Sequence, residues 1–276
     1  MTPTIVFLSD FGLEDEFVGI CHAVIARIAP EAIVIDLTHG VPRGDVFQGA
    51  LLLSRSAPYL PEQAVILGVV DPGVGTRRRA VAVRTVPGHF LVGPDNGLLS
   101  LAFAGTGPVE AVEISSPDIL LTPVSSTFHG RDVFAPAAAH LAKGGALAEL
   151  GPRVDPASLV RLSIPPAVIA HELNEVAAAV LIVDHFGNVK LAASVRDLEA
   201  AGLGAASAIL VSAGGRMSTA RRAVTFGDIA SGALALIEDS SGWLALVVNG
   251  GSASERLGLQ PGQTVTLGQD RSQPAR

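Results

Sequence analysis

The chain has 276 residues, a formal net charge of -7, and 49% hydrophobic but only 4% aromatic residues. The negative charge argues against a nucleic-acid-binding surface, and the apolar runs are too short to predict a membrane span. One cysteine, Cys21, excludes an internal disulfide framework, and the first residues lack the basic segment of a signal peptide. These features predict a cytoplasmic protein, and the length favours two domains.

The first half of the chain alternates short apolar runs with helical patterns. Strands are expected at residues 5–8, 32–37, 64–70, 80–85, 90–92 and 109–114, and helices at 17–28, 45–54 and 133–143. This alternation predicts an α/β domain with a mostly parallel sheet and flanking helices. Asp45 is placed to cap the second helix, and Cys21 is expected to be a packed small residue of the first.

A proline-rich segment separates the alternating strand–helix pattern of the first half from a mostly β pattern in the second. Its prolines are Pro152, Pro156, Pro165 and Pro166. We therefore predict an N-terminal α/β domain at residues 1–155, a linker at 156–165 and a smaller C-terminal β domain at 166–270. Short strands with glycine-rich turns predict that this second domain is a barrel-like or sandwich structure. These strands are expected at 177–183, 189–193, 208–212, 233–238, 243–249 and 264–267.

The most informative stretch covers residues 71–79 and reads Asp-Pro-Gly-Val-Gly-Thr-Arg-Arg-Arg. It follows the apolar run at 64–70, so a carboxylate and three guanidiniums emerge where α/β sheets bind their ligands. Taken alone, the stretch also fits a solvated surface turn. A further alternative is a phosphate-handling hydrolase, in which Gly73, Gly75 and the arginines form an anion cradle.

Four other polar loops lie at the ends of predicted elements, around Asp10, Asn96, His129 and Asp184. Asp10 ends the first strand, where it could bind a ligand or cap the next helix. His129 is followed by a glycine, which would allow a ligand to approach closely. The chain has no Walker loop, dinucleotide-binding fingerprint or nucleophile elbow. Its seven histidines lack metal-ligand spacing, so neither a metal nor a cofactor is expected.

Six segments together resemble the S-adenosylmethionine (SAM) hydroxide adenosyltransferases, which are relatives of fluorinase and the SAM-dependent chlorinase. The segments follow the family's order along nearly the whole chain. They are Ser9-Asp10-Phe11-Gly12, the 71–76 loop with Arg78, Gly-Pro-Asp-Asn-Gly-Leu-Leu at 93–99, Thr-Phe-His-Gly-Arg-Asp at 127–132, Asp-His-Phe-Gly-Asn at 184–188, and Asn249.

The resemblance implies that water or hydroxide displaces methionine from C5′ of SAM, giving adenosine and L-methionine. The family's catalytic Asp, Arg and His fall on Asp71, Arg78 and His129, although Arg77 and Arg79 flank the arginine. SAM is then the substrate rather than a cofactor. The implied substrate-binding residues are Asp10, Asp15, Asn96, Phe128, Asp184, Phe186, Asn188, Phe226, Ser240 and Asn249.

The same resemblance implies roles for these residues. Asp10 would bind the ribose hydroxyls, Asn188 the adenine edge, and two phenylalanines the adenine faces. Asp184 and Asp15 would face the methionine ammonium group, and Ser240 its carboxylate. From local sequence alone, Phe226 could instead pack in a core, and Ser240 could simply belong to a hairpin turn.

The resemblance further implies a homotrimer, with each site between the N-terminal domain of one subunit and the C-terminal domain of its neighbour. The halogenating relatives carry an aromatic residue in place of Asp71, and fluorinase has an inserted loop for which residues 84–93 are too short. Because a carboxylate would repel a halide, no halogenation is expected. The remaining alternative is a protein that binds SAM or adenosine without turnover.

Overall fold

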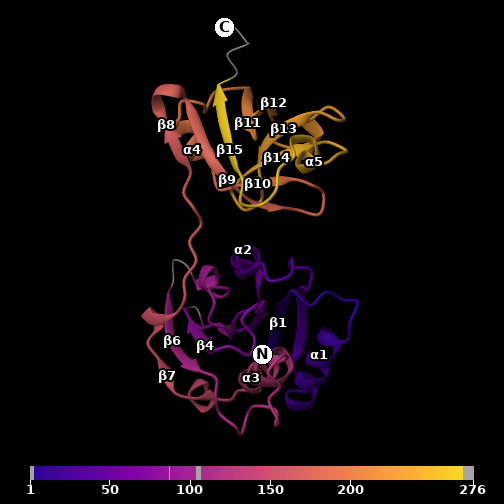
Figure 1. Ribbon diagram of the computed structural model, residues 1–276, viewed down its shortest axis with the longest axis vertical. Coiled ribbons are helices and arrows are strands. Elements are labelled where there is room, and N and C mark those ends of the chain that lie inside the picture. The colour runs from indigo at the N-terminus through magenta and orange to yellow at the C-terminus, as the bar shows by residue number, and fades with distance from the viewer. Residues whose placement is uncertain (1–2, 87, 104–106, 270–276) are drawn as a thin grey trace. The chain divides into compact units, whose positions relative to one another are not determined.

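The computed structural model describes residues 3–86, 88–103 and 107–269. The chain divides into two compact units, Met1–Ser163 (unit 1) and Ile164–Arg276 (unit 2) (Figure 1). Across the described residues, no helix is long and apolar enough to cross a membrane.

Unit 1 is built on a seven-stranded sheet in the order β2-β1-β3-β5-β4-β6-β7. Strands β2, β1, β3 and β5 are parallel neighbours, which confirms the prediction for the first half of the sheet. β4 pairs antiparallel with β5 and β6, because the connection from β4 to β5 is too short for a crossover helix. The strands are β1 (Thr4–Ser9), β2 (Ile33–Thr38), β3 (Val65–Val69), β4 (Ala80–Thr85), β5 (Phe90–Pro94), β6 (Pro108–Glu113) and β7 (Arg153–Val154).

Helices cover both faces of this sheet, as the continuous burial of β1 requires. Ile5 and Phe7 belong to a cluster with α1 (Phe17–Ile28) and α3 (Ala135–Ala142), and these two helices lie side by side (Figure 1). Leu8 packs instead with α2 (Val46–Ser56). The predicted cap of α2 is confirmed, because the Asp45 carboxylate accepts a hydrogen bond from the Gln48 backbone N–H.

Short helical turns lie in several of the loops that connect the strands and helices of unit 1. A π-helical turn at Gly130–Phe134 leads directly into α3. The 3₁₀ turns of unit 1 are Ala57–Tyr59, Ser100–Phe103, Leu147–Leu150 and Pro156–Ser158. Cys21 is fully buried, and this burial raises the pKa of its thiol to about 12, so it is the packed small residue that the sequence predicts.

Three parallel strands of unit 1 end at one edge of the sheet. Asp10 follows β1, Asp71 lies two residues beyond the end of β3, and Asn96 lies two residues beyond the end of β5. The carboxyl ends of neighbouring parallel strands are where α/β sheets hold their ligands. The topology therefore brings three of the predicted polar loops to the same edge.

Unit 2 is a closed barrel. Seven strands follow the order β10-β14-β13-β12-β11-β15-β9, and pairing of β10 with β9 closes the ring, while β8 extends it beyond β9. This confirms the barrel-like prediction. The elements are β8 (Val168–Ala170), β9 (Glu175–Val183), β10 (Val189–Leu191), α4 (Val195–Ala200), β11 (Ala208–Ala213), β12 (Arg216–Arg222), β13 (Leu234–Glu238), β14 (Leu244–Val248), α5 (Ala253–Leu257), β15 (Thr264–Gln269), and 3₁₀ turns at His171–Leu173 and Phe226–Asp228.

Segment 158–162, within the predicted linker, is hydrogen-bonded to other residues of unit 1. The Val160 N–H donates to Asp95 Oδ1, and the Leu162 N–H donates to Ser100 Oγ. Arg79 contacts both the hydroxyl and the carbonyl of Ser158. These bonds fix the end of unit 1 against the turn that carries Asn96.

Replacing Leu246 with alanine should lower the free energy of unfolding of unit 2 by about 2–5 kcal/mol, because it leaves a cavity in a packed core. Leu246 is fully buried on β14. Urea denaturation followed by the fluorescence of Trp243, the chain's one tryptophan, reports on this unit. Met217→Ala, at an exposed position on β12, is the control and should change stability by less than about 0.5 kcal/mol. Equal losses in both variants would contradict this assignment of the core.

Candidate active site

The three predicted catalytic side chains meet in unit 1. Arg78 Nε lies 2.9 Å from Asp71 Oδ1 and 3.0 Å from Oδ2, and its Nη2 also donates to Oδ2. The same Nη2 lies 2.7 Å from His129 Nδ1. The Asp71 and Arg78 side chains are only 6% and 11% exposed. A carboxylate, a guanidinium and an imidazole thus form one hydrogen-bonded chain that is largely shielded from bulk water.

The structure distinguishes the three consecutive arginines. Arg79 turns away from Asp71 and pairs with Asp95, with Nε 2.9 Å from Oδ2. Arg77 is exposed on the surface. Arg78 is therefore the arginine that contacts both Asp71 and His129, which the sequence alone left open.

This pairing also weakens the phosphate-cradle alternative. A cradle for phosphate needs cations available to the anion, whereas the guanidiniums of Arg78 and Arg79 are each paired with a carboxylate. Of the three arginines, only Arg77 carries its charge on an exposed side chain without an ion pair in the described structure.

Local backbone geometry brings the two halves of the site together. Gly75 has a φ of +75°, and a Cβ at this position would lie 2.4 Å from the Ser126 carbonyl oxygen. The 71–79 loop therefore touches the segment that leads to His129 only because residue 75 is glycine. His129 itself immediately precedes the π-helical turn that opens α3.

Gly130 leaves room for two aromatic side chains. A Cβ at residue 130 would lie 2.8 Å from Phe11 Cζ and 3.3 Å from the Phe128 ring. The small residue next to His129 thus allows these rings to pack closely beside the site.

The hydrogen bond to Arg78 defines the state of His129. A guanidinium only donates, so His129 Nδ1 must accept, and the neutral ring carries its proton on Nε2. Burial and the adjacent Arg78 charge hold the pKa of His129 below its usual value, outweighing the opposing effect of Asp71 and Asp132. His129 is therefore a neutral imidazole that offers an N–H group from Nε2.

The predicted substrate-binding residues Asp10, Asp15 and Phe128 of unit 1 have different surroundings. Asp10 Oδ2 accepts a hydrogen bond from the Gly44 N–H at 2.8 Å. Helix α1 begins at Phe17 after Glu16, so the helix-cap alternative for Asp10 is wrong. Asp15 is exposed in the loop before α1. Phe128 packs edge-on against Phe17, with ring centroids 5.2 Å apart.

Asn96 uses its amide within the fold. Its Nδ2 donates to the Val70 carbonyl at 2.8 Å, and its Oδ1 accepts from the Leu98 N–H at 3.1 Å. Val70 directly precedes Asp71. The side chain predicted to bind substrate therefore holds the backbone beside the Asp71 carboxylate.

Unit 2 contains a cavity of about 950 Å³ that gathers five predicted residues. They are Asp184, Phe186, Asn188, Phe226 and Ser240. The two phenylalanine rings are 75% and 46% exposed, respectively. The core-packing alternative for Phe226 is therefore wrong. Two uncovered aromatic rings at one cavity suit a flat, apolar ligand surface such as a purine.

Asp184 organises the loop between β9 and β10. Its Oδ1 accepts from the backbone N–H groups of Phe186 and Asn188, both at 3.0 Å, and its Oδ2 accepts from Asn188 Nδ2 at 3.0 Å. Asn188 is nearly buried. This carboxylate thus fixes the positions of the aromatic ring and the amide at the rim of the cavity.

Ser240 and Asn249 lie after β13 and β14 of unit 2. Ser240 lies in the hairpin between β13 and β14, so the turn alternative is correct, and it lines the cavity as well. Asn249 is not among the lining residues; its Nδ2 donates to the Ile229 carbonyl at 2.6 Å. Asn249 therefore supports the turn that follows Phe226.

The sequence did not predict an ion pair that lines the same cavity. Lys190 Nζ lies 2.7 Å from Asp239 Oδ2, and both side chains are largely buried. Burial raises the pKa of Asp239, but the hydrogen bond from Lys190 and two backbone N–H groups outweigh it and hold this pKa below its usual value. The only local signal was a lysine inside a short apolar strand.

The pKa of His129, measured by NMR, should lie below 6.5, because burial and Arg78 both disfavour the imidazolium ion. Arg78→Gln should raise it, since a nearby positive charge is removed. Arg77→Gln, a change at the exposed neighbour, should leave it unaltered. The His129→Gln spectrum identifies the signal. A value at or above 6.5 in the unmodified protein would rule out the assigned donor and acceptor.

Comparison with known proteins agrees with this arrangement. Residues 5–151 match the model of the SAM hydroxide adenosyltransferase N-terminal domain, and residues 178–266 match that of the C-terminal domain. The chain is 51% identical to the (R)-S-adenosyl-L-methionine hydrolase of Salinispora tropica, covering 96% of this chain and 98% of the relative. It is 44% identical to the enzyme of that name from Thermus thermophilus, covering 95% and 98% of the two chains.

A crystal structure of a conserved protein from Thermotoga maritima has the same fold. It matches with a TM-score of 0.89 and 36% identity, over 96% of this chain and all of the other. The two domain models together span most of the sequence, and the side chains of the six motifs occupy the loops described above. The chain therefore belongs to the SAM hydroxide adenosyltransferase family.

Proposed function

We propose that this protein hydrolyses SAM at C5′ of the ribose, giving adenosine and L-methionine. The contact among Asp71, Arg78 and His129 in unit 1 carries the proposal. It is supported by family membership and by relatives at 44–51% identity that are named (R)-S-adenosyl-L-methionine hydrolases.

The chemistry demands activation of the nucleophile rather than of the leaving group. Methionine leaves a sulfonium centre as a neutral thioether, so no general acid is needed. Water is a weak nucleophile and must be held in line with the C5′–S bond. Positioning of this kind contributes up to roughly 7–11 kcal/mol toward lowering the barrier.

The geometry suggests how the three residues divide this work. The Asp71 carboxylate retains lone pairs that can accept a hydrogen bond from water. His129 Nε2–H can donate to the same oxygen, because its Nδ1 is engaged with Arg78. The Arg78 charge stabilises hydroxide character as the proton leaves. Because Nδ1 of His129 is occupied, Asp71 is the better placed acceptor of that proton.

Substrate recognition is proposed to use the carboxylate after β1 and the cavity of unit 2. Asp10 would bind the ribose hydroxyls, while Phe186 and Phe226 would enclose adenine and Asn188 would bind its edge. Asp184 and Asp15 would face the ammonium group of methionine, and Ser240 its carboxylate. Asn96 and Asn249 would act through the backbone that they hold, and Phe128 through its packing beside His129.

Several finer features complete the proposal. SAM is the substrate, and turnover needs no metal or cofactor. Halide is excluded as a nucleophile by the Asp71 carboxylate.

A cytoplasmic location fits a substrate of central metabolism and a single buried thiol. A homotrimer is proposed, with unit 1 of one subunit and unit 2 of its neighbour forming each site. A SAM or adenosine binder without turnover is the alternative that an assay must separate.

Incubation with SAM in water enriched in ¹⁸O and containing EDTA should give methionine and adenosine that carries ¹⁸O on its 5′-hydroxyl. Mass spectrometry of the products tests both the bond broken and the nucleophile. Asp71→Asn and Arg78→Gln should each lower kcat by about 10²–10³-fold, because each removes a charge that acts on the developing hydroxide.

Arg77→Gln is the matched control and should retain near-normal turnover, since this arginine is exposed. Tight SAM binding without adenosine would favour the sensor alternative. Equal effects at positions 77 and 78 would contradict the assigned arginine.

A subunit-mixing experiment tests the trimer. Asp71→Asn impairs unit 1, and Phe226→Ala impairs unit 2. When the two variants are co-expressed, a site built from two neighbouring subunits should recover about a quarter of normal activity, the share of sites with both parts intact in a random ring. Sites contained within one chain would show no recovery. Light scattering on the same samples gives the mass of the assembly.

A further inference from the structure

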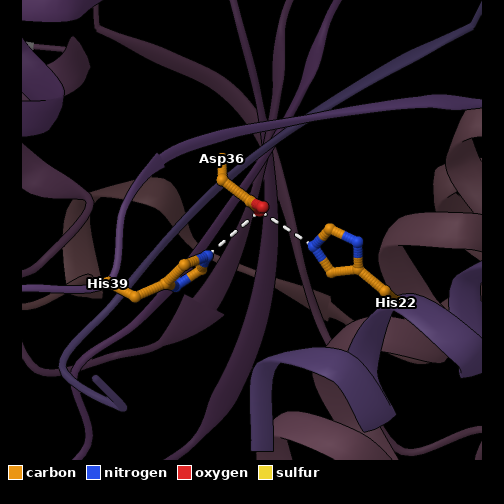
Figure 2. A group of neighbouring side chains, drawn as sticks. All are labelled: His22, Asp36 and His39. Atoms are coloured by element: carbon orange, nitrogen blue, oxygen red, sulfur yellow. Dashed lines mark hydrogen bonds and ion pairs between the residues drawn. The ribbon is translucent and has the colours of Figure 1, made fainter. Parts of the chain in front are cut away.

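A second cluster of polar side chains lies at the edge of the unit 1 sheet. It contains His22 on α1, Asp36 on the edge strand β2, and His39 just after β2. The Nε2 atoms of the two histidines lie 2.8 Å and 3.0 Å from the same oxygen, Asp36 Oδ1 (Figure 2). One ligand-type atom from each residue lies within 4.8 Å of the other two.

His39 is the unusual member of this cluster. The residue is only 4% exposed, and its Nε2 is a buried atom without a well-aligned hydrogen bond among the described residues. Its 3.0 Å approach to Asp36 is close but is not directed along a ring N–H. A buried polar atom normally has a partner. In Figure 2, this nitrogen points toward the same centre as the other two side chains.

The donor set and its accessibility suit a transition metal. Two imidazoles and one carboxylate are common zinc ligands, and zinc is usually four-coordinate. The His22 and Asp36 side chains are 34% and 41% exposed, so solvent can reach the centre and supply a fourth ligand. Tetrahedral binding requires ligand separations of about 3.3 Å, which small shifts of these two exposed side chains can provide.

We infer that His22, Asp36 and His39 form a binding site for Zn²⁺ or a similar divalent transition metal. The ion replaces the protons between the three side chains and joins α1, β2 and the loop after β2. This site is separate from the proposed catalytic chemistry and is structural in character. It does not depend on the proposed function.

Ser9 contacts the ring nitrogen of His39 that faces away from Asp36. Its Oγ lies 2.7 Å from His39 Nδ1 and also accepts a hydrogen bond from the Phe11 N–H at 3.2 Å. A metal on Nε2 requires the ring proton on Nδ1, where it donates to this hydroxyl, and such outer contacts orient metal-bound histidines. Because Ser9 and Phe11 flank Asp10, metal binding also fixes the loop that carries this carboxylate.

The competing explanation is a metal-free network in which the histidines simply hydrogen-bond to Asp36. Burial raises the pKa of Asp36, but the two adjacent imidazoles outweigh it and hold this pKa below its usual value. An ionised Asp36 serves both explanations. The metal-free network, however, leaves His39 Nε2 poorly paired. A measurement of direct metal binding distinguishes the metal site from the metal-free network.

The test uses the full chain, purified without a histidine tag and treated with EDTA. Isothermal calorimetry with Zn²⁺ should show one saturable site per chain, and Co²⁺ should give the strong visible absorption of a tetrahedral centre. Zn²⁺ should also raise the Tm. Mg²⁺ should do neither, because it prefers oxygen ligands in an octahedral arrangement.

Ligand variants connect the binding to these residues. His22→Gln and Asp36→Asn should each weaken Zn²⁺ affinity at least about tenfold, and His22→Gln changes a partly exposed side chain that the fold tolerates. His171→Gln, at an exposed histidine in unit 2, is the matched control and should leave affinity unchanged. The inference is overturned by the absence of saturable Zn²⁺ binding, or by binding that is equally strong in His22→Gln.

Discussion

The pairing of Asp71 with Arg78 is the interaction on which the unit 1 site depends. Two opposite charges held at low exposure are stable only while each keeps its partner. The pair also determines the tautomer of His129, because a guanidinium that faces this ring makes Nδ1 an acceptor and leaves the ring proton on Nε2. One ion pair therefore provides a carboxylate, a fixed charge and an imidazole of defined tautomer. Under the proposed function, hydroxide formed beside this group would meet a preorganised electrostatic environment.

Unit 2 meets a different physical requirement. Its cavity holds aromatic rings that are uncovered in the structure. Binding of a flat ligand would remove this apolar surface from water, which is energetically favourable. The closed barrel gives these rings a rigid support, while Asp184 fixes the rim through backbone hydrogen bonds. Unit 1 thus groups an ion pair with an imidazole, whereas unit 2 offers uncovered aromatic rings. The family's two domain models, over residues 5–151 and 178–266, fall one in each unit.

Much of this organisation could be predicted from local patterns. Buried strands such as β3 are recognised as short continuous apolar runs, and amphipathic helices such as α1 by their helical periodicity. By contrast, β12 was not predicted, because Arg-Met-Ser-Thr-Ala-Arg-Arg lacks an apolar alternation. Similarly, sequence could not choose among three adjacent arginines, since the backbone path of the turn decides which one faces Asp71. The cluster of His22, Asp36 and His39 was missed for a related reason. Its members meet through packing of a helix beside an edge strand, and their spacing carries no recognisable metal motif.

The supporting amides of the two units share a chemical weakness. Asn96 and Asn249 each donate from Nδ2 to a backbone carbonyl beside a functional loop, and each is followed by glycine. Asparagine before glycine is the sequence most prone to deamidation, because the unbranched neighbour lets the backbone nitrogen attack the side chain. Conversion to aspartate would set a carboxylate oxygen against a carbonyl oxygen and exchange a hydrogen bond for repulsion. Deamidation would thus weaken the backbone contacts that Asn96 and Asn249 make beside these loops.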